Sequence, residues 1–249
     1  MSLDDLDLGE APPRRRLHVE GPLAPGAEIA PAPGQAHWLV NVMRLAPGEA
    51  VAVFDGRNGE WRARLAGTRK RPVLAVEAPL RPQEPAPDLW LLFAPIKGAR
   101  TELIAEKATE LGVARLMPVI TRRTAYPKVN LSRLHANAVE AAEQCGGLVV
   151  PEVVQAQPLP EVLGGWDPAR RLLFCDEEGG PPALEALNRS GPGPWAILIG
   201  PEGGFDADER ALLARLDFAV RASLGRRVLR AETAATAALA LWHAALSGG

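Results

Sequence analysis

The sequence has little cysteine, few aromatic residues and no long hydrophobic run. Its 249 residues include only Cys145 and Cys175, which lack the spacing of a metal or redox motif, so we expect two free thiols rather than a disulfide or a zinc site. No apolar run approaches the roughly 20 residues that a membrane helix needs. The N-terminus carries acids where a signal peptide has bases. These absences predict a cytoplasmic protein with no membrane and no metal among its partners.

Several catalytic motifs are missing as well. No glycine-rich G-x-G-x-x-G follows an expected strand, and neither G-K-[ST] nor G-x-S-x-G occurs. The histidines lie far apart, and none has the H-E-x-x-H spacing of a zinc protease. The sequence therefore argues against a Rossmann dinucleotide-binding unit, a P-loop enzyme, a serine hydrolase and a zinc enzyme.

The charge is uneven along the chain, although the net charge is only −2. Residues 1–10 hold four acids and no base, whereas residues 11–84 hold 11 Lys and Arg against 7 Asp and Glu. A basic region of this kind is compatible with contact to nucleic acid. A surplus of this size is also common on solvated surfaces, so it decides nothing by itself.

Two domains are expected on either side of a proline-bearing segment that spans residues 78–88. Residues 1–13 are acidic and are predicted to be disordered. Residues 14–82 read as a small barrel, with a short helix that starts near Gln35 and stops at Pro47-Gly48. The expected strands of this barrel are 50–56, 59–67 and 71–80, the first two joined by a turn at 55–59.

From residue 88 to 249, apolar runs alternate with amphipathic helices, which predicts an α/β domain with a mostly parallel sheet. Gly112 and Asn130 mark helix ends, and Asp206 with Glu209 resembles a capping box. The expected strands are 88–95, 114–120, 171–176, 195–200 and 218–225. The expected helices are 99–111, 131–145, 181–189, 206–217 and 232–246.

Two glycine-bearing loops near the C-terminus are the most informative feature. They lie in Ala196–Phe205 and Ser223–Leu241, each between an expected strand and an expected helix. Open α/β sheets bind ligands at the carboxyl ends of their strands. The second loop also carries three arginines and Glu232. The pair of loops therefore predicts a pocket for a flat, cationic or adenine-bearing small molecule beside a phosphate-rich partner. Taken alone, the first loop is equally compatible with a tight turn that binds nothing.

Four ordered motifs and an N-terminal signature resemble the ribosomal RNA small subunit methyltransferase E family, which belongs to the SPOUT methyltransferases. The motifs are KGARTELIAEKATELGV (97–113), EQC (143–145), LIGPEGGF (198–205) and LGRRVLRAETAA (224–235), and the signature is MRLAPGEAVAVFDGRNGEWRARL (43–65). The resemblance runs from about His37 to Trp242. One departure is Gly147, which stands where the family pattern has a basic residue.

The resemblance implies a PUA-like β-barrel that contacts RNA and an α/β SPOUT domain with a C-terminal trefoil knot. It implies S-adenosylmethionine-dependent methylation of N3 of a uridine in the decoding region of 16S rRNA, within the small ribosomal subunit, by a homodimer. Two alternatives stay open: a non-catalytic RNA-binding module, and a SPOUT methyltransferase that acts on another RNA.

Site residues follow from the matched motifs. We expect Arg230 to stabilise charge and Glu232 to act as a base, while Glu202 holds its loop by accepting backbone N–H groups. The residues expected to bind the cofactor are Phe174, Asp176, Leu198, Gly200, Pro201, Glu202, Gly203, Gly204, Leu224, Gly225, Val228, Leu229 and Thr233. Those expected to face RNA are Lys97, Arg100, Arg122, Arg123 and Arg227. A solvated turn explains Asp176 equally well, and simple surface charge competes for Lys97 and Arg100.

Overall fold

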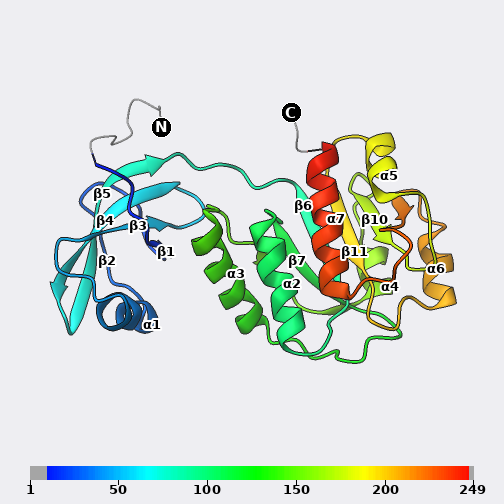
Figure 1. The fold of residues 1–249 in the computed structure, drawn as a ribbon, viewed down its shortest axis with the longest axis horizontal. Coiled ribbons are helices and arrows are strands. Elements are labelled where there is room, and N and C mark those ends of the chain that lie inside the picture. Colours follow the sequence, from blue (N-terminus) through cyan, green and yellow to red (C-terminus); the bar gives the residue numbers. More distant parts are fainter. Residues whose placement is uncertain (1–9, 247–249) are drawn as a thin grey trace. The chain divides into compact units, whose positions relative to one another are not determined.

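The computed structural model describes residues 10–246, which form two compact units (Figure 1). The first unit comprises the described residues up to Pro85 together with Ala142–Val150, and the second comprises Ala86–Ala141 and the described residues from Pro151 onward. The disorder predicted for residues 1–13 falls mainly on residues 1–9, which lie outside the described range. No helix within residues 10–246 combines the length and the apolar character that crossing a bilayer requires.

The first unit is built on a five-stranded sheet with the order β1-β3-β4-β5-β2. β1 runs parallel to β3, and the other neighbours are antiparallel. The three strands expected from the sequence are confirmed as β3, β4 and β5, whereas β1 and β2 were not predicted. The strands are β1 (Arg16–His18), β2 (Glu28–Ile29), β3 (Ala50–Phe54), β4 (Glu60–Thr68) and β5 (Arg71–Arg81).

The helix expected before β3 ends earlier than predicted. α1 (Pro33–His37) continues into a wider π-helical turn, η2 (Trp38–Val42). The backbone N–H of Leu45 then donates to the carbonyl of Leu39 at 3.0 Å. Between them Arg44 takes a left-handed conformation, with φ of 52°. The prediction that Pro47-Gly48 stops the helix is therefore wrong, because a left-handed residue has already closed it.

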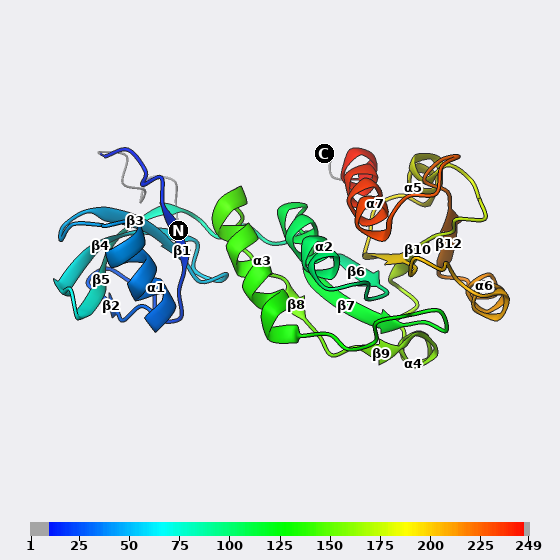
Figure 2. The same ribbon diagram turned by 60° about the horizontal axis from the view of Figure 1, so that its bottom comes forward.

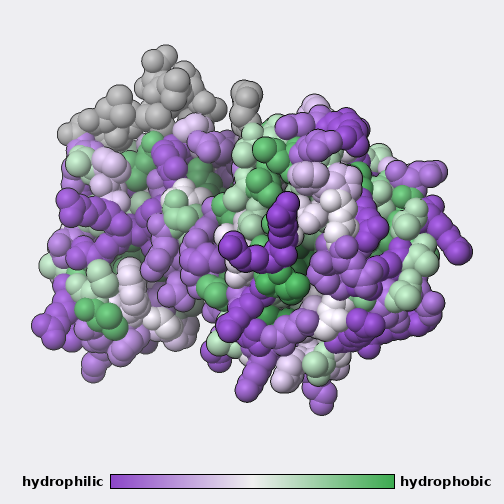
Figure 3. Space-filling view, turned by 45° about the vertical axis from the view of Figure 1, so that its right-hand side comes forward, coloured by the Kyte–Doolittle hydropathy of each residue, from purple (hydrophilic) through white to green (hydrophobic). Residues whose placement is uncertain are grey.

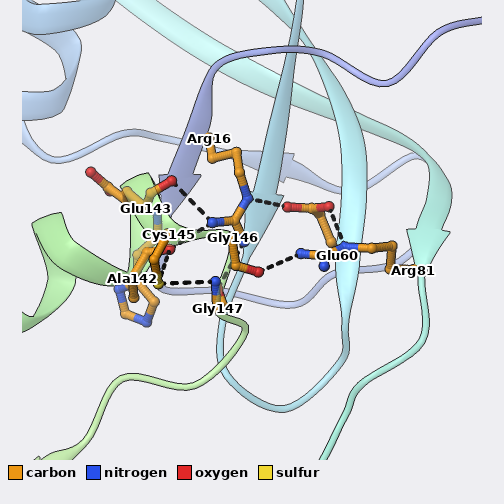
Figure 4. Close-up of polar contacts among 9 residues, drawn as sticks. Arg16, Glu60, Arg81, Ala142, Glu143, Cys145, Gly146 and Gly147 are labelled. Atoms are coloured by element: carbon orange, nitrogen blue, oxygen red, sulfur yellow. Dashed lines mark hydrogen bonds and ion pairs between the residues drawn. The ribbon is translucent and has the colours of Figure 1, made fainter. Parts of the chain in front are cut away.

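The last turn of α3 (Leu131–Cys145) belongs to the first unit. Figure 4 shows the polar contacts that hold it there. Arg16 and Arg81 both pair with the buried carboxylate of Glu60, at 2.5 and 2.8 Å. Their remaining N–H groups donate to carbonyls at the end of α3. Arg16 reaches Ala142, Glu143 and Gly147, and Arg81 reaches Gly146. Two cations therefore satisfy carbonyls that a helix C-terminus leaves without partners.

The second unit contains a parallel sheet with the order β12-β10-β11-β6-β7-β8, and β9 also pairs with β7. Every pairing between strands of this sheet in the described range is parallel, as the alternation of strands and helices predicted. The strands are β6 (Leu89–Phe93), β7 (Arg115–Ile120), β8 (Glu152–Val153), β9 (Gln157–Pro158), β10 (Arg171–Cys175), β11 (Trp195–Ile199) and β12 (Ala219–Ala222).

Helices cover both faces of this sheet (Figures 1 and 2). Side chains alternate along β10, so Leu173 packs with the layer of α2, α5 and α7, whereas Phe174 packs with the layer of α4 and α6. α7 lies between α2 and α5 and buries its alanine-rich face against the sheet. The bounds are α2 (Ala99–Glu110), α4 (Leu159–Gly164), α5 (Ala183–Ser190), α6 (Ala207–Leu213) and α7 (Ala231–Leu246). The capping box is confirmed, because Asp206 accepts from the N–H of Glu209 and Glu209 accepts from that of Asp206.

Strand register brings four strand ends to one level. Ile199 of β11 lies opposite Phe93 of β6 and opposite Cys175 of β10, and Cys175 lies opposite Ala222 of β12. The loops that follow β10, β11 and β12 therefore start side by side. This alignment forms the site, because each of the three loops leaves the same edge of the sheet.

Candidate active site

A cavity lies at the aligned carboxyl ends of β10, β11 and β12. Three loops and the start of α7 line it, and most of the cofactor residues expected from the sequence are among them. Those present in the cavity wall are Asp176, Gly200, Pro201, Glu202, Gly204, Leu224, Gly225, Val228 and Leu229. The two glycine-bearing loops are thus brought together in space.

Four expected cofactor residues do not line the cavity. Phe174 and Leu198 are buried in the opposite layer, where the Phe174 ring packs edge-on against Phe205. Gly203 lies beside the side chain of Arg123, and Thr233 is exposed on α7. Alternation along a strand explains the first two, because residues 174 and 198 point away from the face that carries α7.

The remaining lining residues were not expected to bind the cofactor. One of them, Arg227, was expected to face RNA. The others were not predicted as site residues, and they are Cys175, Glu177, Ile199, Ser223, Arg226, Ala231 and Ala234. Strand register is the signal that would have found Cys175 and Ile199, since they are the paired last residues of β10 and β11.

The glycines of the first loop serve the protein's own packing. A Cβ on Gly200 would come within 2.9 Å of the Phe205 ring. Gly204 has φ of 69°, and a Cβ there would overlap the carboxylate of Glu177. These two glycines let Phe205 and Glu177 approach the backbone, and these contacts shape the loop. Both glycines also line the cavity, and their contact with a cofactor stays a prediction.

An arginine of α6 forms ion pairs with three acidic side chains in the loop that begins at the end of β10. Arg210 pairs with Asp176 at 3.0 Å, with Glu178 at 2.8 Å and also with Glu177. The carboxylate of Asp176 has no solvent exposure and also accepts from Arg221 of β12, at 2.7 and 2.8 Å. Two cations thus compensate the buried carboxylate. Because Asp176 lines the cavity, this network joins its wall to both α6 and β12.

Glu202 forms an ion pair with Arg100 at the start of α2. The expected role for Glu202, accepting backbone N–H groups, is therefore wrong. The hydrogen bond from Arg100 to Glu202 raises the pKa of Arg100, and the charges of Glu202 and then Glu232 act in the same direction. Oε2 of Glu232 is itself buried and has no hydrogen-bond partner among the residues that the structure describes. A carboxylate oxygen without a partner beside a cavity is a candidate for contact with a ligand.

The residues expected to face RNA have different environments. Lys97 and Arg227 are exposed. Arg122 pairs with Asp206 at 3.0 Å and Asp208 at 2.5 Å, so its charge is balanced within the protein. Arg123 donates to the carbonyl of Gly203 at 2.9 Å. Arg122 and Arg123 therefore support the loop and the capping box of α6 in addition to any outside contact.

The second loop carries three arginines and an exposed apolar side chain. Arg226, Arg227 and Val228 line the cavity, whereas Arg230 and Glu232, the two residues expected to act in catalysis, do not. Arg226, Arg227 and Arg230 are exposed, and none has an ion-pair or side-chain hydrogen-bond partner within residues 10–246. Val228 between them is 80% exposed, more than any other large hydrophobic side chain described. Elsewhere, Figure 3 shows hydrophobic residues interspersed among hydrophilic ones. Unpaired guanidinium groups favour contact with phosphate.

The chemistry of the site does not involve the thiol at its floor. Burial raises the pKa of Cys175 to about 12, so the thiol stays protonated and unreactive near neutral pH. No group of three or more metal-ligating side chains occurs in the described part of the chain. The cavity instead offers backbone groups, carboxylates and guanidinium groups.

Family models match both parts of the chain. A model of an RNA methyltransferase domain matches residues 82–243, and a model of an RNA methyltransferase PUA domain matches residues 32–77. Together with the parallel sheet and its loop-lined cavity, these matches define an RNA methyltransferase domain preceded by a PUA-like domain.

Named relatives make the assignment more specific. The ribosomal RNA small subunit methyltransferase E of Rickettsia conorii is 30% identical, over 90% of this chain and 93% of its own length. The Synechocystis protein of the same name is 34% identical, over 88% of this chain and 74% of its own length. The chain belongs to the ribosomal RNA small subunit methyltransferase E family.

Solved structures agree with this assignment. A ribosomal RNA small subunit methyltransferase E from Neisseria gonorrhoeae, bound to S-adenosylmethionine, has a TM-score of 0.83 and is 26% identical, over 92% of this chain and 97% of its own. A methyltransferase from Legionella pneumophila, also in complex with this cofactor, has a TM-score of 0.80 and is 29% identical, over 93% of this chain and 97% of its own.

Proposed function

We propose that this protein transfers a methyl group from S-adenosylmethionine to N3 of a uridine in the decoding region of 16S rRNA. Family membership supports the class of reaction, methyl transfer to ribosomal RNA. The observation that carries the site is the convergence of the loops after β10, β11 and β12 on one cavity, beside three unpaired arginines. The position on the base and the region of the RNA rest on the motif resemblance.

The residues around the cavity fit this cofactor. A Cβ on Gly225 would meet no atom within 4 Å, so the second loop presents bare backbone to open space. The cavity measures about 100 Å³ and is open to solvent, so a ligand bound there extends beyond its walls. When bound, the cofactor supplies a methyl group already activated by its sulfonium.

Glu232 is proposed to take the proton from N3 of the uridine. N3 attacks through a lone pair, and its N–H is a weak acid, so a positioned base assists the reaction. The buried Oε2 of Glu232 has no hydrogen-bond partner among residues 10–246, which leaves it available to accept one from the substrate.

Arg230 is proposed to stabilise the negative charge that develops on the uridine ring as N3 loses its proton. Its guanidinium is exposed and unpaired among the described residues, and Arg230 lies directly before Ala231, which lines the cavity. A cation at this position suits stabilisation of a developing anion. N3 lies on the Watson–Crick edge, and the uridine must therefore be unpaired or extruded. Arg226 and Arg227 are then placed to contact phosphates around it.

The proposed function also includes a location, an oligomeric state and a knotted fold. Substrate in the small ribosomal subunit places the enzyme in the cytoplasm, and the resemblance implies a homodimer and a trefoil knot around the second loop. The mass of one chain is 26.5 kDa, so light scattering should give about twice this value for the working unit.

The decisive experiment is incubation of the protein with labelled S-adenosylmethionine and small subunits that lack the modification, followed by mapping of the labelled base. Methylation of one uridine at N3 in the decoding region is expected. Label on a ribose, on another base or on another RNA would reject this substrate, and cofactor binding without transfer would indicate a binding module instead.

A further inference from the structure

A second cavity lies in the first unit, wholly within the residues matched by the PUA-domain model. It measures about 450 Å³, within the roughly 300–1,000 Å³ typical of small-ligand sites. Its wall is formed by the end of η2, the loop before β3, and the turn between β4 and β5. Leu45 and Leu65, each 5% exposed, and Val40, Pro47 and Pro72 make this wall largely apolar.

Two arginines provide the charge of this cavity. Arg44 and Arg69 line it, and no acidic side chain does. Both are exposed, and neither forms an ion pair within the described part of the chain. An apolar wall with two free guanidinium groups is complementary to a ligand that has a flat ring and an anionic group.

Arg44 has a backbone conformation that is less strained for glycine than for any other residue. It lies just past the helix end in the left-handed region, with φ of 52°, and it is the only non-glycine residue with positive φ among residues 10–246. Glycine is the usual choice at such a helix end, because a Cβ is strained there. Arg44 nevertheless stands at this position and lines the cavity, so the strain marks it as a candidate functional residue.

Arg69 is oriented by a chain of polar groups on the surface. Its Nη2 donates to Oδ1 of Asn41 at 3.1 Å, and Nδ2 of Asn41 donates in turn to Nδ1 of His37 at 3.1 Å. Exposed long side chains normally lose rotamer entropy when they are fixed in this way. Asn41 and His37 thus hold one guanidinium in place beside the apolar wall.

We propose that this cavity binds one nucleotide of the RNA substrate, with the base against Leu45 and Leu65 and the neighbouring phosphates at Arg44 and Arg69. The inference rests on the proposed function for the presence of RNA and adds a contact outside the reacting uridine. Apolar contact with a base face is tolerant of sequence, whereas the two arginines bind backbone phosphate. The site therefore contributes affinity for the substrate and no chemistry.

The test measures binding of the full-length protein to an unmodified 16S rRNA transcript over a series of salt concentrations. Arg44→Gly removes the guanidinium and relieves the strained backbone, so the variant should fold at least as well as the wild type. Arg69→Gln removes the other charge. Each variant should bind RNA about tenfold more weakly, with a salt slope shallower by about 0.7 for one lost phosphate contact to a single strand.

Arg57→Gln is the matched control, because Arg57 is an exposed arginine of the same unit that does not line the cavity. Its RNA affinity should stay near that of the wild type. Calorimetric affinity for S-adenosylmethionine should be unchanged in all three variants. Photocrosslinking with 4-thiouridine in the transcript should label the segment from Leu65 to Arg69.

Unchanged RNA affinity in Arg44→Gly and Arg69→Gln, an equal loss in Arg57→Gln, or crosslinks that avoid this segment would overturn the assignment. The same holds if the wild type binds no RNA or if a protein occupies the cavity. Failure of the proposed function has a different signature, namely a wild type that binds no cofactor or transfers no methyl group to the small subunit.

Discussion

The carboxylate of Glu177 lies directly against the backbone of Gly204, so the loop after β10 packs on the loop after β11. Gly204 has φ of 69°, and any side chain there would displace Glu177 from its pair with Arg210. Two walls of the candidate active site are thus joined at a point where neither wall carries a bulky side chain.

Gly204→Ala should therefore damage both stability and cofactor binding. Left-handed strain costs about 1–2 kcal/mol, and displacement of Glu177 adds to it. We expect a loss of about 2 kcal/mol or more in urea unfolding, and at least about tenfold weaker cofactor binding by calorimetry. Gly179→Ala is the control, because Gly179 has φ of 111° but open space where a Cβ would be. Equal effects of the two substitutions would mean that strain alone, without the Glu177 contact, is responsible.

Arg230→Ala should slow methyl transfer without weakening cofactor binding. The guanidinium is exposed and has no ion-pair partner among the described residues, so its removal leaves no buried charge behind. Loss of one group that stabilises developing charge typically lowers the rate about 10²–10³-fold. Single-turnover rates with small subunits, together with calorimetric cofactor affinity, check this. A wild-type rate in the variant would remove Arg230 from the chemistry.

Glu232→Gln should lower the rate of methyl transfer and leave cofactor binding unchanged. An amide keeps the size of the side chain but cannot accept the N3 proton, so we expect a loss of about 10²–10⁴-fold. Single-turnover rates with small subunits and calorimetric affinity for S-adenosylmethionine check this. A variant that transfers methyl groups at the wild-type rate would show that Glu232 is not the base.

The cap of α6 predicts a dependence of stability on pH. A hydrogen bond from the backbone N–H of Glu209 lowers the pKa of Asp206, and the pair with Arg122 acts in the same direction. A lowered folded-state pKa means that this stabilisation is present above the unfolded pKa of about 3.9 and is lost as pH falls through the folded value. Asp206→Ala should thus unfold at a lower temperature than the wild type at pH 7, and the difference between the two midpoints should shrink as the pH falls below the unfolded pKa. A difference that stays constant as the pH falls would show that the carboxylate charge contributes nothing.

Much of the second unit could be predicted because its signals are local. The apolar run at Trp195–Ile199 and the capping box of Asp206 with Glu209 each specify an element within a few residues. The two-residue strands β8 and β9 gave no such signal, because they are too short for periodicity to be measured. Convergence of the two glycine-bearing loops followed from the rule that parallel strands end at the same edge.

The contacts between distant residues could not be predicted. Arg210 and Asp176 are 34 positions apart, and nothing in the spacing of either residue indicates that they meet. Arg122 reads as a solvated or RNA-facing cation until the fold places two carboxylates beside it. The contacts of Gly200 with Phe205 and of Gly204 with Glu177 could not be predicted either, because they join residues of the loop to a ring and a carboxylate that the fold brings there.

The end of α3 connects the two units, so the chain cannot be divided into them by a single cut. Residues 142–150 pack with the first unit but are covalently part of the chain that builds the second, so the polypeptide passes between the units three times, at 85–86, 141–142 and 150–151. Suppose that a protease cuts the chain once, at Pro85-Ala86 in the proline-bearing segment. The two fragments should stay associated, because Arg16 and Arg81 of the first fragment still donate hydrogen bonds to the carbonyls of Ala142 and Gly146 of the second. If only the residues up to Pro85 were expressed, Arg16, Arg81 and Glu60 would lack the helix end that the two arginines cap.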